Sequence, residues 1–119
     1  MLVVDGTAGG RELLSAILRY CGALVTAVES APAALAVMGL LKPDVLVTDV
    51  DLPGADGYWL IRAVRALKPE DGGMIPAVAM STRGEDGEAE RVRAAGFAGY
   101  LRAPLDPWAL CRLVAELTL

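Results

Sequence analysis

Polar side chains stand at the ends of three short apolar runs of the sequence, where they could do chemistry together. These residues are Asp5, Asp49 and Ser81. Burying an unpaired carboxylate is costly, so two aspartates at neighbouring strand ends would repel each other unless a cation or a shared proton compensated. Magnesium suits such a site because it takes oxygen ligands and keeps several waters. The alternative is that both aspartates only cap the loops and helices that follow them.

The elements that would position these residues alternate along the chain. Apolar runs predict five strands, at residues 1–4, 23–28, 45–47, 75–80 and 99–101. Helical spacing and end signals predict five helices, at residues 13–21, 30–42, 60–67, 85–95 and 106–117. Runs that are apolar throughout indicate strands buried on both faces of a parallel sheet. Alternation of strands and helices therefore predicts a doubly wound α/β domain over residues 1–119, in which ligands bind beyond the carboxyl ends of the strands.

Several residues predict where individual helices begin and end. Ser30 is a candidate N-cap, and Asp106 is another, with Pro107 at the first helical position. Pro43 disfavours helical geometry at Lys42, so the second helix is expected to stop there. The helix at 85–95 has few large apolar side chains and is expected to lie loosely on the surface.

Composition narrows the classes of function. The chain has 119 residues, of which 55% are hydrophobic, and this content excludes intrinsic disorder. Its formal net charge of −4 provides no excess of basic residues for binding nucleic acid or an anionic membrane surface. No apolar run is long enough for a membrane span. The absence of histidine excludes histidine-based catalysis and a phosphohistidine on this chain. Cys21 and Cys111 fit no metal or redox spacing and are interpreted as reduced core thiols of a cytoplasmic protein.

The segment from Val45 to Gly57, with the blocks around Asp5, Ser81, Tyr100 and Pro104, resembles the receiver domain of two-component response regulators. The resemblance covers essentially the whole chain. It implies a five-stranded flavodoxin-like fold with strand order 2-1-3-4-5. It also implies transfer of a phosphoryl group to an aspartate from the phosphohistidine of a histidine kinase or phosphotransfer protein, assisted by Mg²⁺.

The resemblance assigns a role to each matching position. Asp49 corresponds to the phosphoryl acceptor, and Asp5 to one of an acidic pair that binds the metal together with Asp49. Asp51 corresponds to the position whose backbone carbonyl binds the metal. Ser81 corresponds to the hydroxyl that bonds the phosphoryl group, and Tyr100 to the aromatic switch residue that responds to it.

Two positions depart from the family pattern. Gly6 replaces the second acid of the pair, and Ala103 replaces a lysine that contacts the phosphoryl group. We therefore expect a degenerate phosphorylation site with weakened Mg²⁺ binding. Arg102 is expected to point away from the pocket, whereas Arg83 could pair with Asp51 at its mouth. The resemblance also implies a cis peptide bond between Ala103 and Pro104.

Other readings of the sequence remain open. The chief alternative is a pseudo-receiver that acts without phosphorylation as an interaction module, or dimerises through the helix at 85–95, the strand at 99–101 and the last helix. Charges of both signs on the helix at 85–95, with Glu88 and Arg91 among them, suit such pairing but are equally typical of a solvated helix. A phosphatase of the haloacid-dehalogenase type shares Asp49-Val50-Asp51 but needs a suitably placed lysine, and a flavodoxin needs aromatics that flank a flavin. Any output domain is expected to lie elsewhere in a longer chain.

Overall fold

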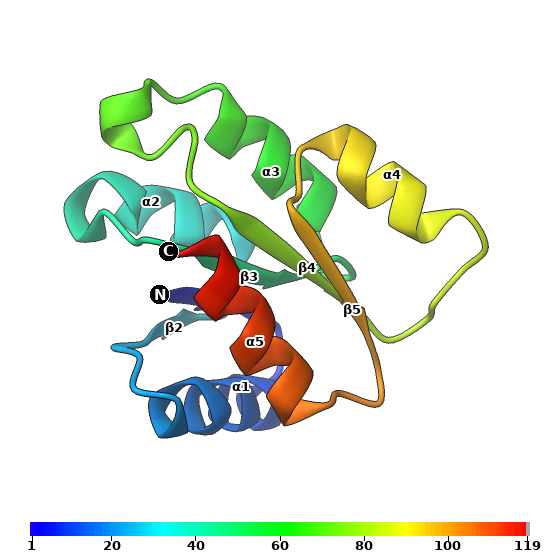
Figure 1. The fold of residues 1–119 in the computed structure, drawn as a ribbon. Coiled ribbons are helices and arrows are strands. Elements are labelled where there is room, and N and C mark those ends of the chain that lie inside the picture. The colour runs from blue at the N-terminus through cyan, green and yellow to red at the C-terminus, as the bar shows by residue number, and fades with distance from the viewer. Residues whose placement is uncertain (119) are drawn as a thin grey trace.

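Five parallel strands form a single sheet in the computed structural model, which describes residues 1–118 (Figure 1). The strand order is β2-β1-β3-β4-β5, as the resemblance to receiver domains implies. The strands are β1 (Leu2–Val4), β2 (Thr26–Val28), β3 (Leu46–Asp49), β4 (Ala77–Ser81) and β5 (Gly99–Arg102). From β1 the chain first adds β2 on one side and then crosses to add β3 on the other side. Ligands of such sheets bind where the strand order reverses in this way, so the carboxyl ends of β1 and β3 are the expected binding site.

Helices cover both faces of the sheet, with α1 and α5 on one face and α2, α3 and α4 on the other (Figure 1). Their bounds are α1 (Ala8–Tyr20), α2 (Ala31–Leu41), α3 (Gly57–Arg65), α4 (Glu88–Ala95) and α5 (Pro107–Leu117), with a short 3-10 turn at Pro69–Asp71. The caps of two helices confirm the sequence analysis. Ser30 Oγ accepts from the backbone N–H of Ala33, and Asp106 Oδ1 accepts from that of Trp108.

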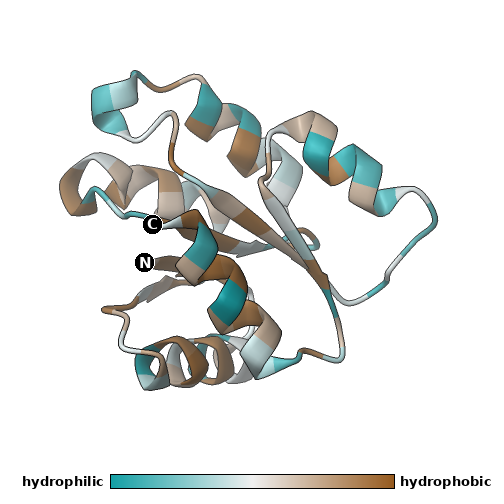
Figure 2. Ribbon diagram, in the orientation of Figure 1, coloured by the Kyte–Doolittle hydropathy of each residue, from teal (hydrophilic) through white to brown (hydrophobic). Residues whose placement is uncertain are grey.

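Alternate side chains of the central strands divide the core into two clusters, one on each face of the sheet. Hydrophobic residues predominate along these strands (Figure 2). In β1, Leu2 and Val4 face α2–α4, whereas Val3 faces α1 and α5. Both sets are fully buried, because successive side chains of a strand point to opposite faces and both faces are covered.

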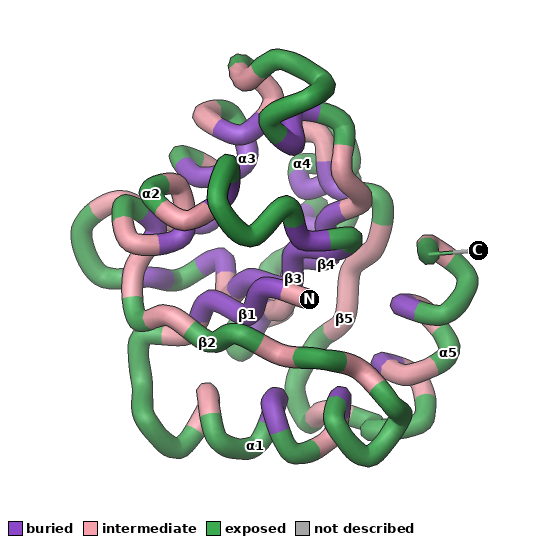
Figure 3. Tube along the Cα trace, turned by 90° about the vertical axis from the view of Figure 1, so that its left-hand side faces the viewer, coloured by how far each residue is buried: buried purple, intermediate pink, exposed green. Residues whose placement is uncertain are grey.

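The two edge strands differ from the prediction that every strand is buried on both faces. Residues of β2 are exposed or half-buried, and so are those of β5, while β1, β3 and β4 are almost wholly buried (Figure 3). A sheet edge has a neighbouring strand on one side only, so helices shield it less. β2 is also shorter than predicted, because residues 23–25 lie outside the strand.

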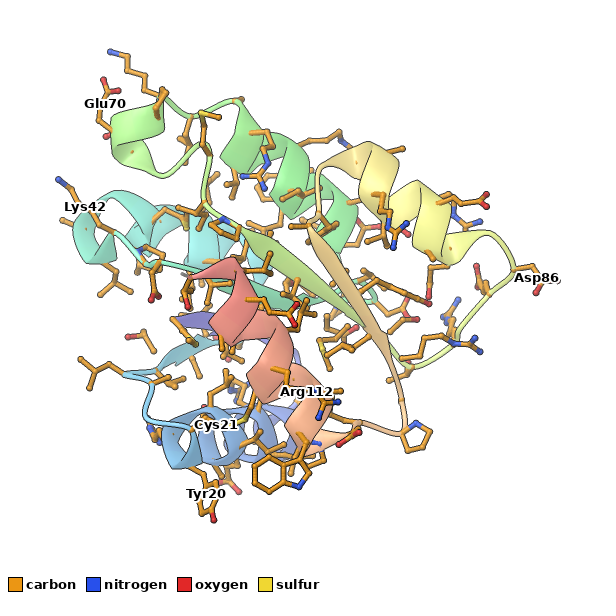
Figure 4. The ribbon with its side chains drawn as sticks, in the orientation of Figure 1. Tyr20, Cys21, Lys42, Glu70, Asp86 and Arg112 are labelled. Atoms are coloured by element: carbon orange, nitrogen blue, oxygen red, sulfur yellow. A yellow bond between two sulfur atoms is a disulfide. The ribbon has the colours of Figure 1, made fainter. Side chains whose placement is uncertain are left out.

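The prediction of two reduced core thiols is wrong. Cys21, the C-cap of α1, is exposed, and it forms a disulfide with Cys111 of α5 (Figure 4). The two Cα atoms lie 6.3 Å apart although the residues are 90 positions apart in sequence. Sequence spacing could not reveal this pair, because the packing of α1 beside α5 creates it.

None of the helices within residues 1–118 combines the length and the apolar character that a membrane crossing requires.

Candidate functional site

Asp5 and Asp49 converge at the carboxyl ends of neighbouring strands. Val4 pairs with Thr48 in the β1–β3 ladder, so the residue after each of them lies at the same edge of the sheet. Both aspartates are half-buried. Burial raises the pKa of the Asp49 carboxyl group, a hydrogen bond from the Asp51 backbone opposes that rise, and the negative charges of Asp5 and Asp51 add to it. We call this anionic site at the ends of β1 and β3, which Asp5, Asp49 and Asp51 form, the hollow.

One oxygen of each carboxylate is already occupied by a local hydrogen bond. Asp5 Oδ1 accepts from the backbone N–H of Thr7 at 2.9 Å and from its hydroxyl at 3.0 Å. Asp49 Oδ1 accepts from the backbone N–H of Asp51 at 2.9 Å. Both aspartates thus cap the loops that follow them, whereas Thr7 and Asp56 cap the helices α1 and α3. This capping leaves the second oxygen of each carboxylate available, so capping and ligand binding are compatible.

Two glycines allow the chain to pass close to these aspartates. A Cβ atom at Gly10 would collide with the carboxylate of Asp5. A Cβ atom at Gly57 would lie 2.7 Å from the Cα of Val50 and 2.8 Å from the carbonyl oxygen of Asp49. Only glycine can therefore start α3 at this distance from the end of β3.

The hollow offers hard oxygen donors of the kind that Mg²⁺ prefers, namely the free oxygens of Asp5 and Asp49 and the backbone carbonyl of Asp51. The residues present fit the ion in chemical type. Their number is small: within residues 1–118, no three acidic, histidine or cysteine residues come together as a metal-binding group. At Gly6 a side chain would lie beside Pro53, with its Cβ 3.2 Å from Pro53 Cδ, so the position is close to the hollow but contributes no carboxylate.

Ser81 lies at the end of β4, next to the strand that carries Asp49. The β3–β4 ladder pairs Asp49 with Met80, so the serine stands one residue further along the same edge. Ser81 is buried, and its Oγ accepts a hydrogen bond from the backbone N–H of Gly84 at 3.2 Å.

The sequence analysis counted Glu88 among the charges on the outer face of its helix, and that interpretation is wrong. Its side chain is only 4% exposed, because α4 begins at Glu88 and turns this residue inward with Val92. The Tyr100 hydroxyl donates a hydrogen bond to Glu88 Oε1. The position of Glu88, one helical turn before the apolar Val92, is the signal that could have placed it on the buried face. Val92 itself is fully buried, so α4 is anchored more firmly than expected.

Ser81, Glu88 and Tyr100 form one polar cluster beside the hollow. Burial opposes ionisation of Glu88, but the neighbouring hydroxyls of Ser81 and Tyr100 and the nearby charges of Arg91 and Arg102 hold the pKa of its carboxyl group below the usual value. Burial and the bond to Glu88 raise the pKa of Tyr100, and the neighbouring Ser81 hydroxyl partly offsets that rise.

Arg83 and Asp51 form the ion pair that the sequence suggested. Arg83 Nε lies 3.8 Å from Asp51 Oδ2, and Arg83 Nη1 lies 3.7 Å from Glu85 Oε1. The arginine side chain is 67% exposed, so the pair sits at the rim of the hollow and contributes little to stability.

Ala103 leaves the hollow without the cation expected there from the family pattern. Its backbone N–H donates to the carbonyl oxygen of Ser81 at 2.7 Å, and its bond to Pro104 is cis, as the resemblance implies. The guanidinium of Arg102 lies against Gly84, where a Cβ atom would collide with it. Arg102 therefore packs on the loop after Ser81, closer to the polar cluster than the sequence analysis anticipated.

The family model of the response regulator receiver domain matches residues 1–115 of this chain. The chain belongs to this family. Receiver domains are parts of two-component phosphorelays and are signalling domains rather than conventional enzymes. The flavin-protein and phosphatase readings of the sequence are thereby set aside.

Two relatives illustrate the range of proteins that contain similar sequences. An uncharacterized 14.6 kDa protein encoded in the sodA1 3′ region of Leptolyngbya boryana is 37% identical over 116 residues, which cover 98% of this chain and 87% of that protein. The response regulator protein FleR of Pseudomonas aeruginosa is 34% identical over 116 residues, which cover 98% of this chain and 24% of FleR. This chain therefore spans about a quarter of the length of FleR.

A solved structure supports the fold and bears on the hollow. The receiver domain of the sensor histidine kinase PA1611 from Pseudomonas aeruginosa PAO1 superposes with a TM-score of 0.87 at 28% identity, covering 98% of this chain and 94% of that one. That structure holds a magnesium ion coordinated in its active site cleft.

Proposed function

We propose that Asp49 of this receiver domain accepts a phosphoryl group from the phosphohistidine of a histidine kinase or histidine phosphotransfer protein. The observation that carries the proposal is the pairing of Asp49 with Asp5 in one anionic hollow, with the hydroxyl of Ser81 on the adjoining strand. A cytoplasmic location, where such partners would meet it, stays a prediction.

The chemistry assigns each described group a task. A carboxylate oxygen of Asp49 attacks phosphorus, the P–N bond to the partner's imidazole breaks, and the ring nitrogen keeps the electron pair. Mg²⁺ held by Asp5, Asp49 and the Asp51 carbonyl would neutralise charge on the carboxylates and the phosphoryl oxygens. Ser81 can donate its hydroxyl proton to a phosphoryl oxygen.

We further propose that the site works weakly, since Gly6 and Ala103 remove one metal ligand and one cationic donor. Their formal charges cancel, so the hollow keeps the net charge of a complete site but lacks two of its contacts. Charge-assisted hydrogen bonds to phosphate are the strong ones, so the missing lysine weakens binding of the phosphoryl group directly.

Arg83 is proposed to partly replace the missing cation. It pairs with Asp51 and Glu85 at the rim and is held near the hollow without being buried. Replacing Arg83 with alanine is expected to shorten the lifetime of the phosphorylated form and leave stability almost unchanged. Arg93→Ala, an exposed arginine on α4, is the matched control; equal lifetimes for the two variants would contradict this role.

The experiment that tests the proposed function is intact-mass analysis after incubation with acetyl phosphate and Mg²⁺. The wild-type protein is expected to gain the mass of one phosphoryl group, and Asp49→Asn is expected to gain none. Removal of Mg²⁺ with a chelator should abolish labelling. A receiver domain that has both the second acid and the lysine, treated in parallel, shows that the reagent is active.

A second candidate function is a pseudo-receiver that signals through contacts alone, by docking a partner or by forming a homodimer through α4, β5 and α5. The two missing contacts at Gly6 and Ala103 favour it. Absence of labelling in the wild-type protein, with labelling of the complete receiver, would select this candidate over phosphoryl transfer. A sedimentation measurement would then show whether two copies associate.

A further inference from the structure

The disulfide between Cys21 and Cys111 lies between two openings of the molecular surface (Figure 4). Both cysteines line a larger cavity at the amino ends of β1 and β2. Both also line a shallow apolar groove, whose other residues include Ile17, Tyr20, Pro107 and Trp108. Cys21 is exposed and Cys111 is half-buried. A thiol in solution can therefore approach the bond from the side of Cys21 without unfolding of the domain.

Each of the two bridged helices is held on the sheet by its own buried residues. Leu14 and Leu18 of α1 are almost completely buried, and so are Leu110 and Val114 of α5. All four belong to the core cluster on that face of the sheet. Because apolar burial fixes each helix on the sheet independently of the bond, the bond adds a direct link between two helices that are already anchored.

We propose that Cys21 and Cys111 form a reversible redox site, at which a dithiol reductant opens the bond while the domain stays folded. A thiolate of the reductant attacks the Cys21 sulfur, the S–S bond breaks, and Cys111 leaves as a thiolate that takes up a proton. The second thiol of the reductant then attacks the mixed disulfide and releases Cys21. The protein gains two thiols and the reductant becomes a disulfide. The site is separate from Asp49 and does not depend on the proposed function.

Reduction is expected to change the face that α1 and α5 form together. One wall of the groove comes from α1, with Ile17 and Tyr20, and the other from α5, with Pro107 and Trp108. The bond holds these walls together, since it joins the two helices with their Cα atoms 6.3 Å apart. Without the bond the walls are free to shift, so a well-defined apolar groove is expected in the oxidised form alone.

The first test follows reduction of the native protein by dithiothreitol, with alkylation of the new thiols and intact-mass analysis. The rate is expected to depend only weakly on low concentrations of urea, because the reaction proceeds in the folded state. A rate that rises with urea as steeply as the unfolding equilibrium would show that the bond opens only after unfolding, and would overturn the proposal. Oxidised glutathione should restore the bond, and its failure to do so would contradict reversibility.

Trp108 provides a reporter for the groove, because it lies one helical turn before Cys111 and lines the groove with it. In Trp59→Phe, where Trp108 is the sole tryptophan, reduction is expected to raise the fluorescence, since a disulfide quenches a neighbouring indole. The matched control is Trp108→Phe, whose remaining tryptophan lies in α3 on the other face of the sheet and should not respond. An equal response in both variants, or no response in either, would contradict a local change at the groove.

Hydrogen exchange distinguishes a local release from a loss of the fold. Reduction is expected to accelerate amide exchange several-fold in the last turn of α1 and the first turns of α5, and to leave α2 and α3 unchanged. Faster exchange throughout the chain would show that the bond is needed for the whole fold, and would overturn the proposal, as would unchanged exchange in α1 and α5. The Cys21→Ser, Cys111→Ser double variant should match the reduced protein. If it does not fold, the wild type kept in dithiothreitol supplies the measurement.

Discussion

Cys21 and Cys111 are joined by a disulfide across 90 positions of the chain. The bond ties the end of α1 to α5, the two helices that cover one face of the sheet. Tyr20 and Trp108, both largely exposed, lie beside it and line a shallow apolar groove with Ile17 and Pro107.

The bond is expected to stabilise the oxidised protein strongly. Because it closes a loop of most of the chain, the entropy model gives an upper value of ~4.5 kcal/mol. A Cys21→Ser, Cys111→Ser double variant should therefore unfold at a markedly lower temperature than the air-oxidised wild type. Thermal unfolding of the wild type under reduction is the control and should approach the variant. Two reactive thiols in the oxidised, native wild type would contradict the prediction.

Asp49→Asn is expected to stabilise the protein at neutral pH. Burial raises the pKa of Asp49, so between the ordinary aspartate value and the raised one the native state binds more protons than the unfolded state. Stability therefore falls as the pH rises through this window, and asparagine removes the penalty. The gain in melting temperature should be largest near pH 7 and should shrink as the pH approaches about 4. Asp86→Asn, an exposed control, should show no such dependence.

Gly6→Asp is expected to raise the affinity for Mg²⁺ on the order of tenfold, by adding a carboxylate beside the hollow. Its Cβ would lie 3.2 Å from Pro53 Cδ, a tight contact that a small shift of the proline ring can relieve. Isothermal titration with Mg²⁺ measures the change. Gly39→Asp, which adds the same charge on α2 where a Cβ meets nothing within 4 Å, is the control. Equal affinities for both variants would show that position 6 does not face the metal.

Tyr58→Phe is expected to stabilise the protein. The Tyr58 hydroxyl is buried and has no hydrogen-bond partner among the described residues. An unpaired buried hydroxyl costs about 1–3 kcal/mol, and a gain of ~1 kcal/mol corresponds to about 4 °C in a domain of this size. Tyr20→Phe, at a tyrosine that is 83% exposed, should leave the melting temperature unchanged. A lower melting temperature for Tyr58→Phe would indicate that the hydroxyl is bonded in solution.

The sequence predicted those features that depend on local pattern. Apolar runs and helical spacing indicated the alternation of strands and helices, and the resemblance supplied the strand order. Asp5 and Asp49 were placed correctly because parallel strands bring their carboxyl ends to one edge. Ser30 and Asp106 were recognised as caps because a cap is decided by a few neighbouring residues.

Features that depend on how distant elements pack were missed. The disulfide forms because α1 lies beside α5, and no local sequence pattern around Cys21 indicates that it pairs with Cys111. Glu88 was assigned to the surface because its neighbours in sequence are charged. Its burial follows from where α4 begins and from the hydroxyl of Tyr100, which only the folded chain brings to it.

Gly57 shows how one absent methyl group can set the dimensions of a site. Since α3 starts in contact with the main chain of Asp49 and Val50, the helix and the end of β3 have no side chain between them. A displacement of the Asp49 backbone would therefore move the first turn of α3 directly, because no flexible side chain lies between them. Alanine at position 57 would wedge the two apart and shift the buried residues Leu60 and Ile61 away from the sheet.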